Sequence, residues 1–203
     1  MKNKVCFLSA IILIFLSSCK QRCSLFDRSL LAWQPHTLGD TLIFKDTIGN
    51  VIKFVISKYY ISEGGEFPKC SKCACGVSSY TESQEDSTHN ISYLDFTIYY
   101  FASEQNQFGL NILNCPFTFW LDYSETTYTV LKYSSQEKSF VMESHQVKKR
   151  MTINDKTYYD IMDIEDDSLH PNDFPIWKVL LSKGKGIIQF YDKRTHTSFA
   201  LQE

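Results

Sequence analysis

The sequence predicts an all-β fold in which an antiparallel meander forms a sandwich or a partly closed barrel. Three observations predict it. Aromatic residues make up 15% of the chain, and most of them are Phe and Tyr, which favour pleated strands. From residue 41 onward, apolar residues recur at every second position, as in strands with one buried face. Short segments rich in Gly, Asn and Asp, which are typical of tight turns, separate these runs.

The first strands form a hairpin. Residues 41–45 and 51–57 flank a turn that contains Gly49 and Asn50, two residue types that accept a positive φ. Two further segments, 94–98 and 117–121, alternate in the same way and are expected to be strands, and 128–133 and 139–142 are expected to form another pair of strands.

The C-terminal third predicts two more hairpins and a closing strand. The turns are expected at 154–156 and 182–186, because Asn, Asp and Gly gather there between apolar runs. The flanking strands are 151–153, 158–164, 176–181, 187–191 and, at the end, 199–201. We expect a helical turn only within 141–150, and a polar surface loop at 64–90.

The first nineteen residues have the order of an export signal. Lys2 and Lys4 precede an apolar run at 5–16, which is too short for a membrane-spanning helix. The small residues Ser17 and Ser18 then precede Cys19, and this pattern resembles the lipobox of bacterial lipoproteins. The resemblance implies that the signal is removed and that Cys19 is acylated. Several acyl chains would then anchor the protein durably to a membrane.

These observations divide the chain into three parts. Residues 1–18 are a lipoprotein signal peptide, 19–28 are the lipidated N-terminus and a spacer, and 29–203 form a single β-rich domain with a cysteine-containing loop at 64–90. The formal net charge of −2 and the scattered basic residues do not indicate a nucleic-acid partner. We expect the lipid to be the only attachment to the membrane.

Four cysteines allow three interpretations. Cys70, Cys73 and Cys75 form a Cys-x-x-Cys-x-Cys cluster, and Cys115 stands alone far along the chain. An exported protein meets an oxidising compartment, which favours one or two disulfides among these four. The alternatives are zinc bound by the four thiolates, or free and redox-active thiols.

No pattern marks a catalytic site. The chain has no Gly-x-Ser-x-Gly motif and no paired metal-binding histidines, so we expect no enzymatic activity and no cofactor. The acidic residues at 160–167 indicate a solvated charged loop. Trp33, Trp120 and Trp177 fit the core of the strands, although an exposed cluster of them would suit the faces of sugars or peptides.

The end of the chain also resembles known proteins. Residues 176–179, 186–190 and 199–201 read Ile-Trp-Lys-Val, Gly-Ile-Ile-Gln-Phe and Phe-Ala-Leu. Together with the lipobox and the aromatic strands, this ending resembles small lipoproteins of the Bacteroidota. The resemblance implies a place in the cell envelope and no activity. Because Lys20, Gln21 and Arg22 are not acidic, it implies an outer-membrane anchor that faces the periplasm.

Two functional classes follow. The first is a non-enzymatic binding or assembly lipoprotein that recognises an envelope protein, a glycan or a lipid. The second is a metal-binding or redox-linked domain that uses Cys70, Cys73, Cys75 and Cys115.

Overall fold

The computed structural model describes residues 28–62, 74–83, 93–101, 105–113, 115–134, 138–166 and 175–202. Within them the chain forms a short 3-10 helix, η1 (Arg28–Trp33), and thirteen strands. None of the helical residues in this part of the chain forms a segment long and apolar enough to cross a membrane.

The strands follow one another in a meander, as the sequence predicted. The first seven are β1 (Thr41–Lys45), β2 (Val51–Ser62), β3 (Ala74–Ser83), β4 (Tyr93–Phe101), β5 (Gln105–Ile112), β6 (Cys115–Asp122) and β7 (Thr127–Ser134). The remaining six are β8 (Ser139–Gln146), β9 (Lys148–Ile153), β10 (Lys156–Glu165), β11 (Ile176–Ser182), β12 (Gly186–Asp192) and β13 (Thr197–Gln202).

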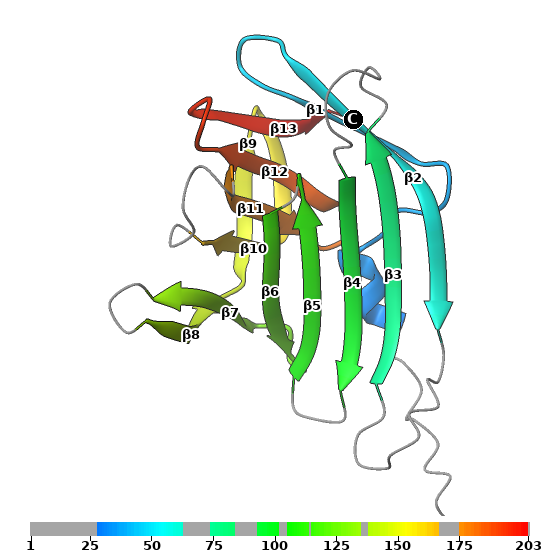
Figure 1. The fold of residues 1–203 in the computed structure, drawn as a ribbon, viewed down its shortest axis with the longest axis vertical. Helices are drawn as coiled ribbons and strands as arrows, with labels where there is room; N and C mark the ends of the chain where they lie inside the picture. The colour runs from blue at the N-terminus through cyan, green and yellow to red at the C-terminus, as the bar shows by residue number, and fades with distance from the viewer. Residues whose placement is uncertain are drawn as a thin grey trace, which may run out of the picture.

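On either side of β1, the strands form two antiparallel sheets, β8 to β2 with seven strands and β13 to β9 with five, that are arranged as a sandwich and are not closed. Strand β1 hydrogen-bonds to both β2 and β13, so the backbone ladder continues from one layer to the other in the order β8-β7-β6-β5-β4-β3-β2-β1-β13-β12-β11-β10-β9. In Figure 1 the strands β2 to β6 stand upright in front, and β10 to β13 run across them behind. The all-β prediction is confirmed.

Turn chemistry places the three predicted hairpins correctly. Gly49 has a φ of 102° between β1 and β2, and Gly184 and Gly186 have positive φ between β11 and β12. Asn154 and Asp155, between β9 and β10, have φ values of 49° and 64°, the pattern of a tight type I′ turn. Each turn was predicted because only a few residue types accept this backbone conformation.

The helical turn expected within 141–150 is wrong. The segment is extended and supplies most of β8 and the beginning of β9. Strand β8 pairs with β7 along its whole length, and β9 pairs with β10. The backbone hydrogen bonds gained in these two ladders outweigh a weak local preference for helix.

The loop expected at 64–90 is also partly wrong, because β3 occupies residues 74–83 in the middle of it. Strand β3 joins β2 to β4, although its sequence is polar and lacks apolar alternation. Strand β5 was not predicted, yet Phe108, Leu110 and Ile112 alternate along it and are buried. That alternation is a signal that could have found this strand.

The interior between the layers is apolar and aromatic. Phe44, Phe54 and Phe190 meet there edge-on, and Phe108 stacks on Phe119 with ring centroids 5.1 Å apart. Helix η1 adds Leu30 and Trp33 to the same cluster, and Trp33 has no exposed surface. The helix therefore fills the space between the sheets.

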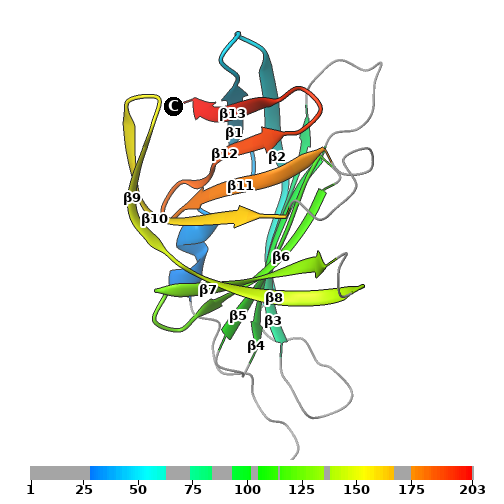
Figure 2. The same cartoon turned by 90° about the vertical axis from the view of Figure 1, so that its left-hand side faces the viewer.

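A second, smaller cluster lies on the other face of the five-stranded layer. It consists of Ile153, Tyr158, Ile161, Leu180, Ile188 and Ala200. Asp160 has a φ of 47° and interrupts the alternation of β10, so that Tyr158 and Ile161 both enter this cluster although they are three residues apart. Figure 2 shows the β9–β10 hairpin curling up beside β11, β12 and β13.

The two ends of the ladder belong to one extended segment. Strands β8 and β9 are joined only by Val147, which is buried in the main core and donates its N–H to Thr126 O at 2.8 Å. The first half of the segment therefore pairs with β7 and the second half with β10. We call the line between β7 and the end of β10 the seam.

A tyrosine hydroxyl bridges this seam. The hydroxyl of Tyr128 on β7 donates to Asp163 O at 2.6 Å and accepts from Asp163 N at 2.9 Å. Asp163 lies on β10 beyond the last residue paired with β9. The side chain thus satisfies two backbone groups that have no strand beside them. Burial raises the pKa of Tyr128 to about 12, so the hydroxyl keeps its proton at neutral pH.

Replacing Tyr128 by Phe should therefore destabilise the fold. The change removes one oxygen and leaves the N–H and C=O of Asp163 without that partner, which costs about 1–3 kcal/mol. Urea unfolding measures the loss, and faster hydrogen exchange at the Asp163 amide locates it. Tyr159→Phe is the matched control because the Tyr159 ring is exposed. Equal stabilities of the two variants would contradict the role of the hydroxyl.

Candidate aromatic and charged binding face

Polar side chains gather on the outer face of β10, β11 and β12. On β10, Met162 and Ile164 point into the main core, and Asp163 and Glu165 point the other way. The register places Glu165 beside Lys178 of β11, and Lys178 beside Tyr191 of β12. The alternation of the strands therefore builds a row of charged and aromatic groups across the sheet.

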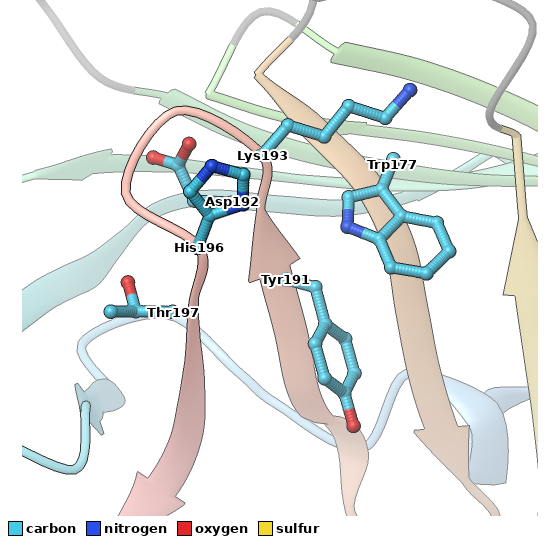
Figure 3. A pocket seen from close by; sticks show the side chains of 6 residues that line it. All are labelled: Trp177, Tyr191, Asp192, Lys193, His196 and Thr197. Atoms are coloured by element: carbon cyan, nitrogen blue, oxygen red, sulfur yellow. The ribbon is translucent and has the colours of Figure 1, made fainter.

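One end of this row is a cavity of about 450 Å³, which we call the aromatic pocket. At the edge of this pocket, the pairing of β11 with β12 shifts register between Ile176 and Lys178, so Trp177 has no paired residue on β12. Figure 3 shows that the rings of Trp177 and Tyr191 flank one side of the pocket and that the side chain of Lys193 extends above it. The lining residues are Trp177, Tyr191, Asp192, Lys193, His196 and Thr197.

The two rings form a tilted pair with centroids 5.9 Å apart. The ammonium of Lys178 lies 6.0 Å from the Trp177 ring and 5.7 Å from the Tyr191 ring. A cation at this distance is attracted to both aromatic faces. Lys178 therefore lies within cation–π range of both rings.

The turn between β12 and β13 forms the opposite wall. Asp192 accepts hydrogen bonds from the backbone N–H and the guanidinium of Arg194, at 2.8 and 3.0 Å. His196 in the same turn is exposed and has a φ of 54°. The hydroxyl of Thr197 is hydrogen-bonded to that of Thr195. This wall therefore presents donors and acceptors opposite the rings.

A charged cluster lies next to the aromatic pocket. Lys178 forms ion pairs with Glu165 and, at 2.9 Å, with Asp163, and Asp163 also pairs with Lys148 of β9. Burial alone would raise the pKa of Asp163, but the hydrogen bonds and charges of the two lysines lower it. Burial would likewise lower the pKa of Lys178, but its carboxylate partners raise it. Asp163 and Lys178 are therefore both ionised at neutral pH.

The other end of the row is a cavity of about 350 Å³ at the seam, which we call the seam pocket. Its lining residues are Tyr128, His145, Gln146, Lys148, Asp163 and Glu165. The ring of His145 on β8 stacks on that of Tyr128 with centroids 5.3 Å apart. Strands from both sides of the seam therefore contribute to this pocket.

Sequence reasoning found only part of this face. Trp177 was a candidate for a ligand groove, and it does line a pocket, whereas Trp33 is in the core and Trp120 is half-buried on β6. The acidic stretch expected to be a solvated loop is in β10 as far as Glu165, where its carboxylates form ion pairs. Lys178 and Tyr191 were missed, because their meeting depends on strand register.

The predicted cysteine site is only partly within the described residues. Cys115 is a free, fully buried thiol, and the backbone N–H of Ile176 donates to its sulfur at 3.1 Å. Burial raises the pKa of Cys115 to about 11. The thiolate is the form that binds metal and attacks disulfides. At neutral pH Cys115 is therefore protonated and poorly suited to either role.

The structure does not bring Cys75 and Cys115 together. In the backbone register, Cys75 of β3 is paired with Tyr100 of β4. Cys115 is paired with Ile112 of β5, and Ile112 is paired with Leu94, at the other end of β4. The offset between Tyr100 and Leu94 is about 20 Å along the strand, and a disulfide requires Cα atoms within about 7 Å.

The remaining candidates lie outside the described residues. They are Cys70, Cys73 and the lipidation candidate Cys19. Within the described ranges, no three His, Cys, Asp or Glu side chains are grouped as a metal site would require.

Comparison with known protein families, with characterised proteins and with solved structures finds no match. The chemistry of the face described above is therefore the basis for a functional proposal.

The environment of Cys115 predicts a slow reaction with alkylating reagents. At pH 8, iodoacetamide should leave Cys115 unmodified in the folded protein and modify it rapidly in urea, because the folded thiol is buried and its pKa is raised to about 11. Mass spectrometry of the peptide containing Cys115 measures this difference. Rapid labelling without urea, or a disulfide at Cys115, would contradict the assignment.

The same pKa predicts a loss of stability in alkali. The pKa of the Cys115 thiol is about 11 in the folded protein and near 9 in the unfolded chain, so the protonated thiol favours the folded state. This contribution to the free energy of unfolding is fully present below pH 9 and is lost as the pH rises towards 11. Cys115→Ala should unfold with a smaller decline across this range. If urea unfolding shows that Cys115→Ala loses stability between pH 9 and 11 as steeply as the unchanged protein, other groups cause the loss.

Proposed function

We propose that the protein is a lipid-anchored, non-enzymatic binding module of the cell envelope that takes its ligand in the aromatic pocket. One observation carries this proposal. Trp177 and Tyr191 border a cavity of about 450 Å³ whose other wall is polar. This volume lies within the range of roughly 300–1,000 Å³ that small-molecule sites occupy.

The chemistry of the pocket favours a ligand with one apolar face and several hydrogen-bonding groups. Aromatic rings bind a flat apolar surface over a large area, and Trp177 and Tyr191 already lie side by side, against each other and Lys178. Lys193, His196 and Thr197 then face the polar edge of such a ligand. A pre-oriented site loses little conformational entropy when the ligand binds.

The charges near the pocket favour binding over catalysis. A general acid or base works best with a pKa near neutrality. The pKa of Asp163 is lowered and that of Lys178 is raised, so both move away from that range. Ion pairs hold these groups in fixed positions, which suits recognition.

Attachment to a membrane through Cys19 completes the proposal. Eight residues, 20–27, lie between Cys19 and Arg28, the first residue of η1. A fully extended spacer of this length reaches about 30 Å. We propose that it holds the binding domain close to the outer membrane, on the periplasmic side.

Replacing Cys19 by Ser should release the protein from membranes, because a hydroxyl in place of the sulfur removes the acylation site. Fractionation of cells that produce each form measures the change, and Cys23→Ser, four residues away, is the matched control. Membrane partition that is the same for Cys19→Ser and the unchanged protein would overturn the anchor.

The binding proposal predicts a specific response of one tryptophan. In a nuclear magnetic resonance screen of sugars, short peptides and lipid headgroups, at least one class should shift the indole N–H signal of Trp177. The signal of Trp33 should not move, because that indole is buried and donates to Glu125. Trp177→Ala assigns the signal and should weaken binding, and Tyr60→Ala, which removes an exposed ring on β2, should not. Ligands that bind without moving the Trp177 signal would overturn the site.

A further inference from the structure

We infer that the ligand is a linear oligosaccharide that runs across the strands from the aromatic pocket to the seam pocket. This inference rests on the proposed function and names the ligand class. It comes from the finding that the two pockets lie on one face and share a boundary.

Lys178 is that boundary. Its ammonium lies against the two rings of the aromatic pocket and is ion-paired with Glu165 and Asp163, which line the seam pocket. The two cavities, of about 450 and 350 Å³, are therefore neighbours separated by one side chain and its partners. A ligand that fills one and extends over Lys178 enters the other.

The length of this path suits a chain. It crosses from β12 over β11 and β10 to β9, which is roughly 15 Å at a spacing of about 4.8 Å between strands. A single sugar ring fills only one pocket at a time. A chain of several rings contacts both.

The side chains along the path match the hydroxyl groups of sugars. Each hydroxyl both donates and accepts a hydrogen bond. The carboxylate of Glu165 is partly exposed and keeps lone pairs beyond the one used by Lys178, and His145 and Gln146 add further polar atoms at the far end. The rings of Trp177 and Tyr191 supply the apolar surface at the near end.

A peptide is less suited to the same path. One common way in which an extended peptide binds is by adding a strand to a free sheet edge, where backbone groups are open. The path instead crosses β11 and β12, whose edges are already paired on both sides. A ligand on this path must therefore be recognised by side chains that project from the face of the sheet. Aromatic rings and carboxylates on such a face can stack on and hydrogen-bond to a saccharide.

Calorimetric titration tests the inference with linear neutral and uronic-acid-containing oligosaccharides of one to six residues. Affinity for at least one series should rise with length until the path is filled. His145→Ala and Gln146→Ala should weaken the longest member by about three- to tenfold, as for one lost hydrogen bond each, and leave the single sugar unchanged. Trp177→Ala should weaken every member, and Tyr60→Ala should weaken none.

Three results would overturn the inference. In the first, single sugars bind as tightly as long chains and the seam variants have no effect; the aromatic pocket then remains a binding site, but for a small ligand. In the second, only peptides move the Trp177 signal, which also leaves the proposed function intact. In the third, no saccharide binds, and whether the proposed function fails as well is decided by the Trp177 signal in the wider screen.

Discussion

The structure depends on how its two layers are held together where the backbone ladder stops. Strand β1 links the layers on one side through ordinary pairing with β2 and β13. On the other side, the extended segment formed by β8, Val147 and β9 changes partners from β7 to β10. The hydroxyl of Tyr128 bonds both backbone groups of Asp163 at this place. Buried backbone groups must find partners, so a side chain does here what a neighbouring strand does elsewhere.

This way of joining the layers has a consequence for the binding face. Asp163 is fixed from two sides, by Tyr128 through its backbone and by Lys148 and Lys178 through its carboxylate. Its carboxylate is ion-paired with Lys178, and Lys178 in turn lies against Trp177 and Tyr191. The seam and the aromatic pocket are therefore mechanically connected by a short series of polar contacts. Ion pairs that are only partly buried contribute modestly to stability, and their main effect is to fix geometry.

The features predicted correctly from the sequence are those set by neighbouring residues. The β9–β10 hairpin follows from Asn154 and Asp155, whose positive φ values belong to a few residue types. Errors arose where distant strands decide the outcome. Polar β3 is extended because β2 and β4 flank it, and residues 141–150 are extended because β7 and β10 pair with them. The binding face was missed for the same reason: Lys178 and Tyr191 are thirteen residues apart and meet only through the register of β11 and β12.

The arrangement of charges explains why this face stays exposed in a protein with so many aromatic residues. Rings that face the interior meet only other apolar groups, as Phe108 and Phe119 do. Trp177 and Tyr191 instead have an ammonium against them, and burying Lys178 with its carboxylates under another apolar layer would remove their hydration at a large cost. The second cluster, centred on Leu180 and Ile188, carries no such charge, and the β9–β10 hairpin covers it. The same sheet face is thus covered where it is apolar and open where it is charged, which leaves the aromatic pocket accessible to a ligand.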